Sequence, residues 1–311
     1  TVAHALHAHG AHAFFDFAAS GPYVQIDKKP GQPDGYDAVF LSPHKFVGGP
    51  GTPGLLCFQQ HLYQLQTPTT AGGGTVKYVS RTGQVYLDDI EAREDAGTPT
   101  ILGKIRTALA FKVKEQLGVK NLTVRNHELF RRALTRLQAQ PRVRLLGNVD
   151  ASRLALLSFV MTTSSGTQLH PRLVVRLLND LFGIQARGGC ACAGPYGHVL
   201  LEIDDDHSER FMQCALNNLD GIKPGWTRLN LAPWATDEEV DRALVRTAGV
   251  REREVLHRVA AIRSSGEHGV DILHVTEADD AGQILAHHRN DEGRRAGGPV
   301  PQAAEGGEGP E

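Results

Sequence analysis

The residues with the clearest capacity for chemistry are a lysine and an aspartate 29 positions apart. Lys45 stands in the segment 42–54, which is so rich in glycine and proline that it predicts a loop. A lysine amine condenses with an aldehyde when burial or nearby positive charge favours its neutral form. Asp16 ends a short apolar run, where a carboxylate could hold the proton of a ring nitrogen. Taken alone, a surface lysine and an acid at a strand end are the simpler interpretation.

The motifs around these two residues resemble a known family. Asp16–Ala18, then Ser42–Lys45 and a glycine-rich turn, are similar to the D-x-A and S-x-H-K motifs of the class V aminotransferase and cysteine desulfurase family, which uses pyridoxal 5'-phosphate (PLP). The resemblance makes Lys45 the Schiff-base lysine. It assigns cofactor binding to six residues: Asp16, Ala18, Ser42, His44, Lys45 and Thr98. Ala19 follows the first motif at the position where desulfurases often have a glutamine that contacts the phenolic oxygen of PLP. The resemblance therefore supplies no residue for this contact.

The family pattern gives the motif residues separate roles. Asp16 is expected at the pyridine nitrogen, which keeps the ring electron-withdrawing. Ser42 is expected at the phosphate, and His44 beside the phosphate and Lys45, with a catalytic role. The implied architecture is a fold-type I PLP enzyme, an α/β fold with a mainly parallel sheet followed by a small α+β domain.

Further segments extend the resemblance. Gly72–Val76 and Asp95–Pro99 are similar to family segments in the same order. Thr98 corresponds to a threonine that reaches the cofactor of the partner subunit, so the resemblance implies a homodimer. Arg228 lies in a predicted strand at the place of an arginine that grips the substrate carboxylate, for which a guanidinium is a bidentate partner. A structural ion pair is the alternative for this arginine.

A cysteine-containing loop points to sulfur chemistry. Arg187–Pro195 resembles the R-x-G-x-x-C-A-x-P motif of one desulfurase group, which makes Cys192 the catalytic, sulfur-accepting residue. A thiolate on a glycine-rich loop near cations is a competent nucleophile. Cys190 is equally placed by composition, and a tight turn of small residues is the structural alternative. Zinc binding by these cysteines and His198 lacks the usual C-x-x-C spacing, so no metal site is expected.

Short apolar runs separated by loops and helical patterns predict the elements that position these residues. Strands are expected at 12–17, 37–41, 54–58, 143–146, 155–161, 183–187 and 227–231. Helices are expected up to residue 9 and at 101–118, 122–138, 171–181 and after Thr236, which forms a capping box with Glu239. Apolar positions in 101–118 make that helix amphipathic: Ile101, Ile105, Ala108 and Leu109. The domains expected are a partial PLP-binding domain at 1–117, a small domain at 118–262 and a disordered polar tail at 263–311.

Composition excludes several classes of protein. Hydrophobic residues make up 41% of the 311 residues and charged residues 22%, which is typical of a globular protein. The net charge of −2 gives no reason to expect nucleic acid or membrane partners, and no apolar run is long enough to span a bilayer. The four cysteines favour a reducing intracellular compartment. The histidines of the first 12 residues are read as a solvated helix face because no nearby carboxylate or cysteine joins them.

Three functions remain open. A cysteine desulfurase-like enzyme acting on a small amino acid, with Cys192 as persulfide carrier, is the leading hypothesis. An aminotransferase in which Cys192 is structural is the second, and a non-catalytic protein retaining the fold is the third. Because the chain starts at Thr1 near an interior strand, we expect a C-terminal fragment that is inactive alone.

Overall fold

The computed structural model describes residues 1–190, 193–217 and 223–250. The chain divides into two units, Thr1–Ile203 with Gly225–Val255, and Asp204–Pro224 with Leu256–Glu311. The expected disordered tail and Cys192 lie outside the described residues.

The first sheet carries the two motifs around Asp16 and Lys45. Its order is β1 (Phe14–Asp16), β2 (Ala38–Leu41) and β3 (Leu55–Phe58), with β1 parallel and β3 antiparallel to β2. Helix α1 (Val2–Ala8) precedes the sheet, and the short 3-10 helix η1 (Pro43–Lys45) follows β2 directly. The strands expected at 12–17, 37–41 and 54–58 are therefore confirmed with shorter bounds.

A connecting segment follows this sheet. It contains the 3-10 helix η2 (Gln60–Leu62), the antiparallel hairpin of β4 (Val76–Val79) and β5 (Gln84–Tyr86), and helix α2 (Ile90–Glu94). The apolar and charged residues of this segment do not form a clear alternating pattern, and the sequence analysis predicted none of these elements.

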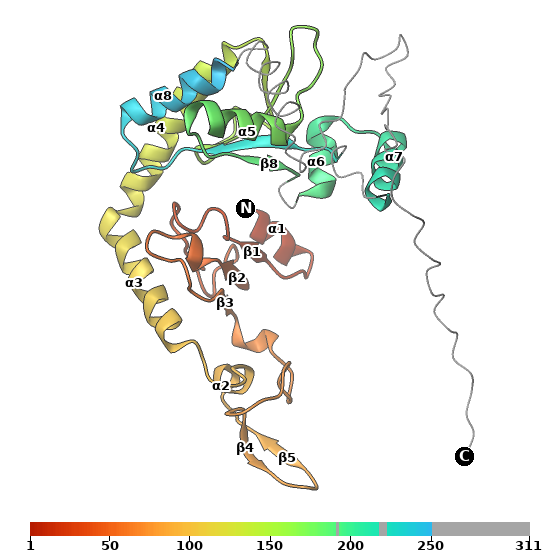
Figure 1. The fold of residues 1–311 in the computed structure, drawn as a ribbon. Coiled ribbons are helices and arrows are strands. Elements are labelled where there is room, and N and C mark those ends of the chain that lie inside the picture. The colour runs from red at the N-terminus through yellow and green to blue at the C-terminus, as the bar shows by residue number, and fades with distance from the viewer. Residues whose placement is uncertain (191–192, 218–222, 251–311) are drawn as a thin grey trace, which may run out of the picture. The chain divides into compact units, whose positions relative to one another are not determined.

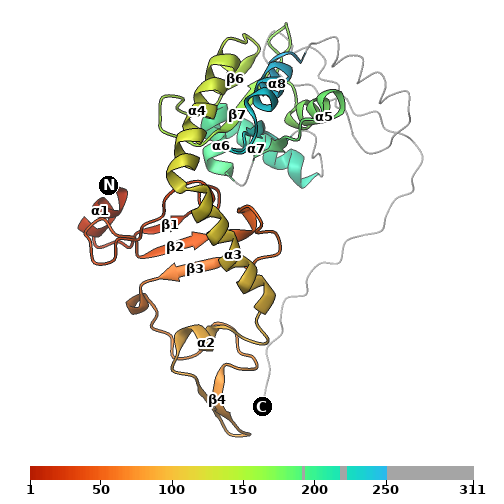
Figure 2. The same cartoon turned by 90° about the vertical axis from the view of Figure 1, so that its left-hand side faces the viewer.

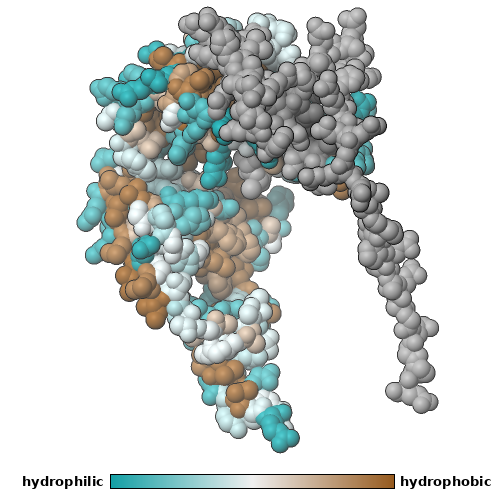
Figure 3. Space-filling model, viewed as in Figure 1, coloured by the Kyte–Doolittle hydropathy of each residue, from teal (hydrophilic) through white to brown (hydrophobic). Residues whose placement is uncertain are grey.

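Helix α3 (Ile101–Leu117) runs along one side of the first sheet (Figures 1 and 2). The helix is confirmed, but its face is the reverse of the one expected. Ile101, Ile105 and Leu109 are 53–59% exposed, and Leu102 is 81% exposed. The buried positions are Gly103, Thr107, Ala110 and Lys114. The small residues on one face of α3 allow the helix to approach the 42–54 loop closely. The apolar stripe therefore faces outward, and brown atoms mark it in Figure 3.

The second sheet has a well-covered core. Its order is β6 (Val143–Leu145), β7 (Leu156–Met161), β9 (Trp226–Asn230) and β8 (Arg187–Gly189), all antiparallel. Helices α4 (Val119–Gln138), α5 (Pro171–Phe182) and α8 (Asp237–Ala248) pack with it. Their side chains and those of β7 include fully buried residues: Leu129, Ala133, Leu137, Leu157, Phe159, Val174, Leu177, Leu178 and Leu244.

One strand of this sheet is shifted from its expected position. Residues 183–187 were predicted as a strand, but Gly183 ends α5 in the left-handed conformation, with φ 66°. Glycine accepts this conformation without a Cβ penalty, and it reverses the chain after the helix. The strand begins only at Arg187, where pairing with Arg228 becomes possible.

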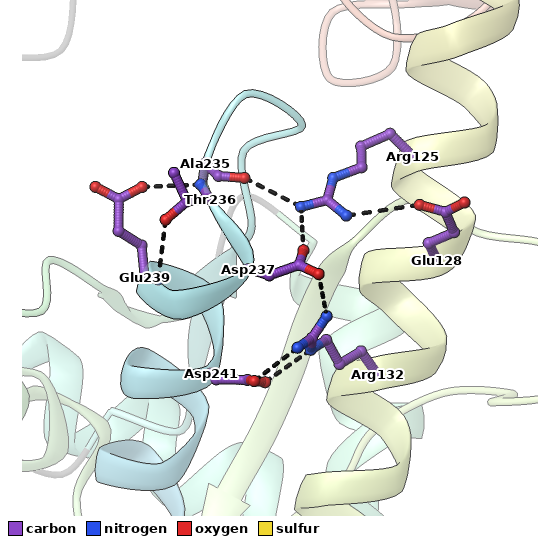
Figure 4. A network of polar contacts seen from close by, with 8 residues as sticks. All are labelled: Arg125, Glu128, Arg132, Ala235, Thr236, Asp237, Glu239 and Asp241. Atoms are coloured by element: carbon purple, nitrogen blue, oxygen red, sulfur yellow. Dashed lines mark hydrogen bonds and ion pairs between the residues drawn. The ribbon is translucent and has the colours of Figure 1, made fainter.

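Ion pairs join helices α4 and α8 (Figure 4). Arg132 binds Asp241 through Nε and one terminal nitrogen, at 2.7 and 2.6 Å, and Asp237 through the other, at 2.7 Å. Arg125 binds Asp237 at 2.7 Å. The predicted capping box of α8 is present: Glu239 N donates to Thr236 Oγ1, and Thr236 N donates to the Glu239 carboxylate. These contacts fix the last described helix against α4.

Besides α2, two further α-helices were not predicted. Helix α6 (Gly194–Leu201) packs its buried Gly197 close to the ring of Trp226. In the second unit, α7 (Asp205–Leu216) begins at Asp204, whose carboxylate accepts a hydrogen bond from His207 N at 2.8 Å. Within the described chain, every helix is too short or too polar to cross a membrane.

Candidate PLP-binding site

The lysine and the aspartate follow neighbouring parallel strands. Asp16 is the last residue of β1, and its Cα partner on β2 is Phe40. Lys45 ends η1, which begins two residues after β2. Because the carboxyl ends of parallel strands meet at one edge of a sheet, both residues lie at the edge where ligands bind in open α/β sheets. The structure thus places at one edge of the sheet the two residues on which the sequence interpretation depends.

The turn that holds Lys45 is defined by close backbone contacts. Lys45 N donates to Ser42 O at 3.0 Å, and Phe46 N donates to Pro43 O at 2.9 Å. A Cβ on Gly49 would lie 1.9 Å from Pro43 O, so no other residue fits there. Phe46, the residue after Lys45, is only 3% exposed, and its buried ring anchors the turn to the protein interior. The lysine therefore stands on a rigid turn.

The side chains available at this edge fit a PLP-like group. Lys45 and His44 are exposed, and in the described part of the chain the Lys45 amine has no hydrogen-bond or ion-pair partner. The Ser42 hydroxyl does not cap η1 and stays available to an anion. Asp16 uses Oδ1 to accept the Ala18 amide at 2.6 Å. One carboxylate oxygen orients the acid, and the other is left for a ring nitrogen.

The two downstream glycine segments contact each other. Gly97 N donates to Gly73 O at 2.8 Å, and the buried Thr75 hydroxyl donates to Gly72 O at 2.7 Å. Thr98 follows this contact, is exposed, and lies just before α3. None of the described contacts joins Thr98 to Asp16 or Lys45. Its role in cofactor binding stays a prediction.

Arg228 lies on a face of β9 that points toward the loop after Asp16. Asn230, two residues along the same strand and so on the same face, donates to the Tyr23 hydroxyl at 3.3 Å. Arg228 is directly opposite Arg187 of β8. Among described residues, Arg228 has no ion-pair partner, so the structural ion pair considered as an alternative is not found there. Neither of these two facing arginines pairs with an acid among the described residues, so both guanidinium groups are available to an anion.

The cysteine loop begins at the end of β8. Gly189 pairs with Trp226, and Cys190 follows with an exposed, free thiol. A Cβ on Gly225 would lie 2.7 Å from the Gly189 backbone, so the two strands touch closely where the loop starts. Trp226 and Arg228 share a face of β9. The loop thus starts beside the strand that carries Arg228, whereas Cys192 itself lies outside the described residues.

The N-terminal histidines have a carboxylate partner, which corrects the sequence interpretation. Asp37 accepts from His7 Nε2 at 2.8 Å and lies 3.8 Å from His12 Nδ1. His7 Nδ1 also contacts Pro33 O at 2.9 Å. Asp37 follows His7 by 30 positions, so sequence proximity could not show the pairing. No group of three metal-ligating side chains occurs in the described ranges.

Asp37 and His7 stabilise each other's charged forms. The hydrogen bond to Asp37 raises the pKa of His7 above 6.5. Burial alone would raise the pKa of Asp37, but hydrogen bonds from Ala13 N and His7 hold it below 3.8. The pair fixes α1 next to the strand that leads to Lys45.

Comparisons with known proteins agree with the motifs. The sequence model of the aminotransferase class-V family matches residues 1–243. A cysteine desulfurase of Klebsiella pneumoniae is 28% identical over 246 residues, which cover 79% of this chain and 52% of that protein. A cysteine desulfurase of Escherichia coli is 30% identical over 236 residues, covering 76% and 50%.

A solved structure shows the same fold. The apo cysteine desulfurase of Thermococcus onnurineus superposes with a TM-score of 0.56 and 26% identity, covering 77% of this chain and 52% of that one. This likeness confirms the predicted α/β fold of the fold-type I group. The chain spans about half the length of the relatives it matches. Since the family's sequence model covers most of its residues, the chain belongs to the aminotransferase class-V family, whose members depend on PLP.

Proposed function

We propose that the chain carries the PLP-binding lysine and part of the substrate site of a cysteine desulfurase-like enzyme. The observation that supports this most is the position of Asp16 and Lys45 at the ends of adjacent parallel strands. Bound PLP would supply an aldehyde that condenses with amines and a ring that withdraws electrons from the substrate α-carbon.

The chain's own residues would divide the remaining work. The Asp16 carboxylate would hold the proton of the ring nitrogen, and the Ser42 hydroxyl would donate to the phosphate. His44 would lie beside the phosphate and Lys45. Lys45 Nζ would hold the cofactor and would take the proton of the substrate α-carbon as general base. Ala18 and Thr98 are the remaining cofactor contacts proposed.

Arg228 would bind the α-carboxylate of a small amino acid. Its lack of an acidic partner among described residues and its position opposite Arg187 support an anionic ligand. A guanidinium on a paired strand also loses little freedom when it binds, which suits a group that fixes substrate orientation.

Cys192 would accept sulfur. Its thiolate would attack the substrate sulfur and break the Cβ–S bond, whose electron pair would pass to the carbon. Cys192 would then carry the persulfide, and the three-carbon fragment would take up protons and leave as alanine. The free thiols of Cys57 and Cys190 support a reducing compartment, in which such a nucleophile survives.

A second copy of the chain is the partner we propose. The outward stripe of α3, defined as Ile101, Leu102, Ile105 and Leu109, is an exposed apolar surface. It begins three residues after Thr98, the residue implied to reach the partner's cofactor. A homodimer that buries this stripe would bring Thr98 to the interface.

Incubation with L-cysteine of a PLP-loaded, full-length protein that contains this chain tests the proposal. With a dithiol present to reduce the Cys192 persulfide back to the thiol, we expect alanine and sulfide in equal amounts, with no product from Lys45→Ala. Cys192→Ala should lose desulfuration, whereas Cys190→Ala, the matched neighbour, should retain it. Amino-group transfer to an oxo acid without sulfide release would instead identify an aminotransferase, and full activity of Cys192→Ala would remove the persulfide role.

A further inference from the structure

A second lysine lies buried beneath the Lys45 turn. Lys114 is on the inward face of α3 and is 9% exposed. Its Nζ donates to Gly21 O at 2.6 Å and to Val24 O at 2.7 Å, and it lies 5.4 Å from the centre of the Phe46 ring. Within the described residues, no carboxylate pairs with it.

Such an amine is costly to bury. Lysine is almost never fully buried without a pair, because its charge loses hydration. Burial lowers the pKa of Lys114, while two carbonyl oxygens and the face of an aromatic ring favour the ammonium form. A methionine would fill the same volume at lower cost, so packing alone does not explain a lysine here.

The contacts of Lys114 join the two loops of the candidate site. Gly21 and Val24 belong to the loop after Asp16, and Phe46 directly follows Lys45. The loops also touch each other, because a Cβ on Gly21 would lie 3.3 Å from the Phe46 ring. Phe46 packs on Phe111 of α3, with ring centres 4.9 Å apart. One ammonium group therefore holds both strand-end loops against a single helix.

We propose that Lys114 is a positioning residue for PLP, which sets the place of the Lys45 amine relative to the Asp16 carboxylate. The proposal rests on the proposed function, since it concerns the same site. The structural alternative is that Lys114 only holds the loop 17–24 in the fold, without affecting the cofactor.

The test compares Lys114→Met with Lys112→Met, an exposed lysine of the same helix. PLP is titrated into each protein, and the absorbance of bound PLP is followed against pH. Loss of two hydrogen bonds from a charged donor should weaken PLP binding about tenfold in Lys114→Met. The pH midpoint of the absorbance band should also move, whereas Lys112→Met should match the wild type in both.

Folding is checked by circular dichroism and by the urea midpoint of each variant. If Lys114→Met does not fold, Phe46→Leu replaces it, because this change removes the ring face above the Lys114 ammonium and keeps an apolar side chain to anchor the turn. Phe46→Leu should then weaken PLP binding and move the midpoint.

A folded variant with wild-type PLP affinity and pH midpoint would overturn the positioning role. Absence of any PLP absorbance band in the wild type would instead reject the proposed function, so the two failures are distinguishable.

Discussion

The two larger sheets of the chain differ in how well they bury their own apolar residues. In the sheet β6–β7–β9–β8, against which α4 and α5 pack, Leu157 and Phe159 are at most 1% exposed. In the sheet β1–β2–β3, Phe14, Phe40 and Leu56 are 42–53% exposed. The first sheet carries Asp16 and Lys45, and the second carries Arg228.

The two sheets therefore differ in their roles: the second contributes most to stability, and the first carries the residues of the candidate cofactor site. The second sheet and its helices bury enough apolar surface to form a stable core, and ion pairs join α4 to α8. The first sheet buries fewer apolar residues, Ala38, Val39 and Leu41 of β2 among them, and specific polar contacts add to this burial: those of His7 with Asp37 and of Lys114 with two carbonyls. We therefore expect substitutions in the second sheet to affect global stability, and substitutions in the first to affect the candidate site.

The largest effect is expected from Phe159→Ala, which opens a cavity in the second core. A fully buried phenylalanine replaced by alanine costs about 3–5 kcal/mol of unfolding free energy. Phe40→Ala, in the first sheet, should cost about 1 kcal/mol because the ring is already 42% exposed. Urea unfolding measures both, and equal losses would show that the two sheets do not differ as described.

Loss of the capping box should have a smaller effect. Thr236→Ala removes the acceptor for Glu239 N at the start of α8 and should lower the unfolding free energy by about 1 kcal/mol. Thr236→Ser keeps the hydroxyl and serves as control. A loss with serine as large as the loss with alanine would mean that the hydroxyl does not contribute.

The ion pairs of α4 and α8 should contribute less and depend on salt. Arg132→Met removes contacts to Asp237 and Asp241, both partly exposed, so a small drop in melting temperature is expected. The difference from wild type should shrink at high salt, because exposed charges are screened. A difference that grows with salt would contradict an electrostatic origin.

The pH dependence of the first sheet should come from His7 and Asp37. Because the pKa of His7 is raised in the folded state, His7 contributes fully to stability below pH 6.5, and this contribution is lost as the pH rises through its folded-state pKa. Because the pKa of Asp37 is lowered, Asp37 contributes to stability above pH 3.8, and this contribution is lost as the pH falls through its folded-state pKa. Protection of α1 and β2 amides from hydrogen exchange should therefore fall toward alkaline pH.

Asp37→Asn removes this dependence, and His4→Gln, exposed on the same helix, is the control. The same alkaline loss of protection in Asp37→Asn as in wild type would exclude the pair as its cause.

Much of the candidate site was predictable from the sequence because its residues sit in local motifs. Asp16 ends one short apolar strand and Lys45 lies in the short turn after the next, and parallel pairing of these strands brings both residues to one edge. The start of α8 was predictable from Thr236 and Glu239, which are three residues apart and form the capping box with each other. This contact depends on no residue that is distant in the sequence.

Lys114 and the shifted β8 were not predictable in the same way. The acceptors of Lys114 are 90 and 93 positions away in the chain, so its sequence neighbours suggest a solvated lysine. The large apolar residues of α3 predicted the wrong buried face, because small residues on the other face make the close contact with the 42–54 loop. The start of β8 depends on pairing with β9, which follows it by about 40 residues.

Reduction with borohydride after PLP binding tests the central claim most directly. The reagent fixes PLP to the lysine that binds it, and peptide mass mapping then identifies the residue. We predict a phosphopyridoxyl group on Lys45 in the wild type, and none on any lysine in Asp16→Ala at the same PLP concentration. Labelling of another lysine with Lys45 unmodified would contradict the account.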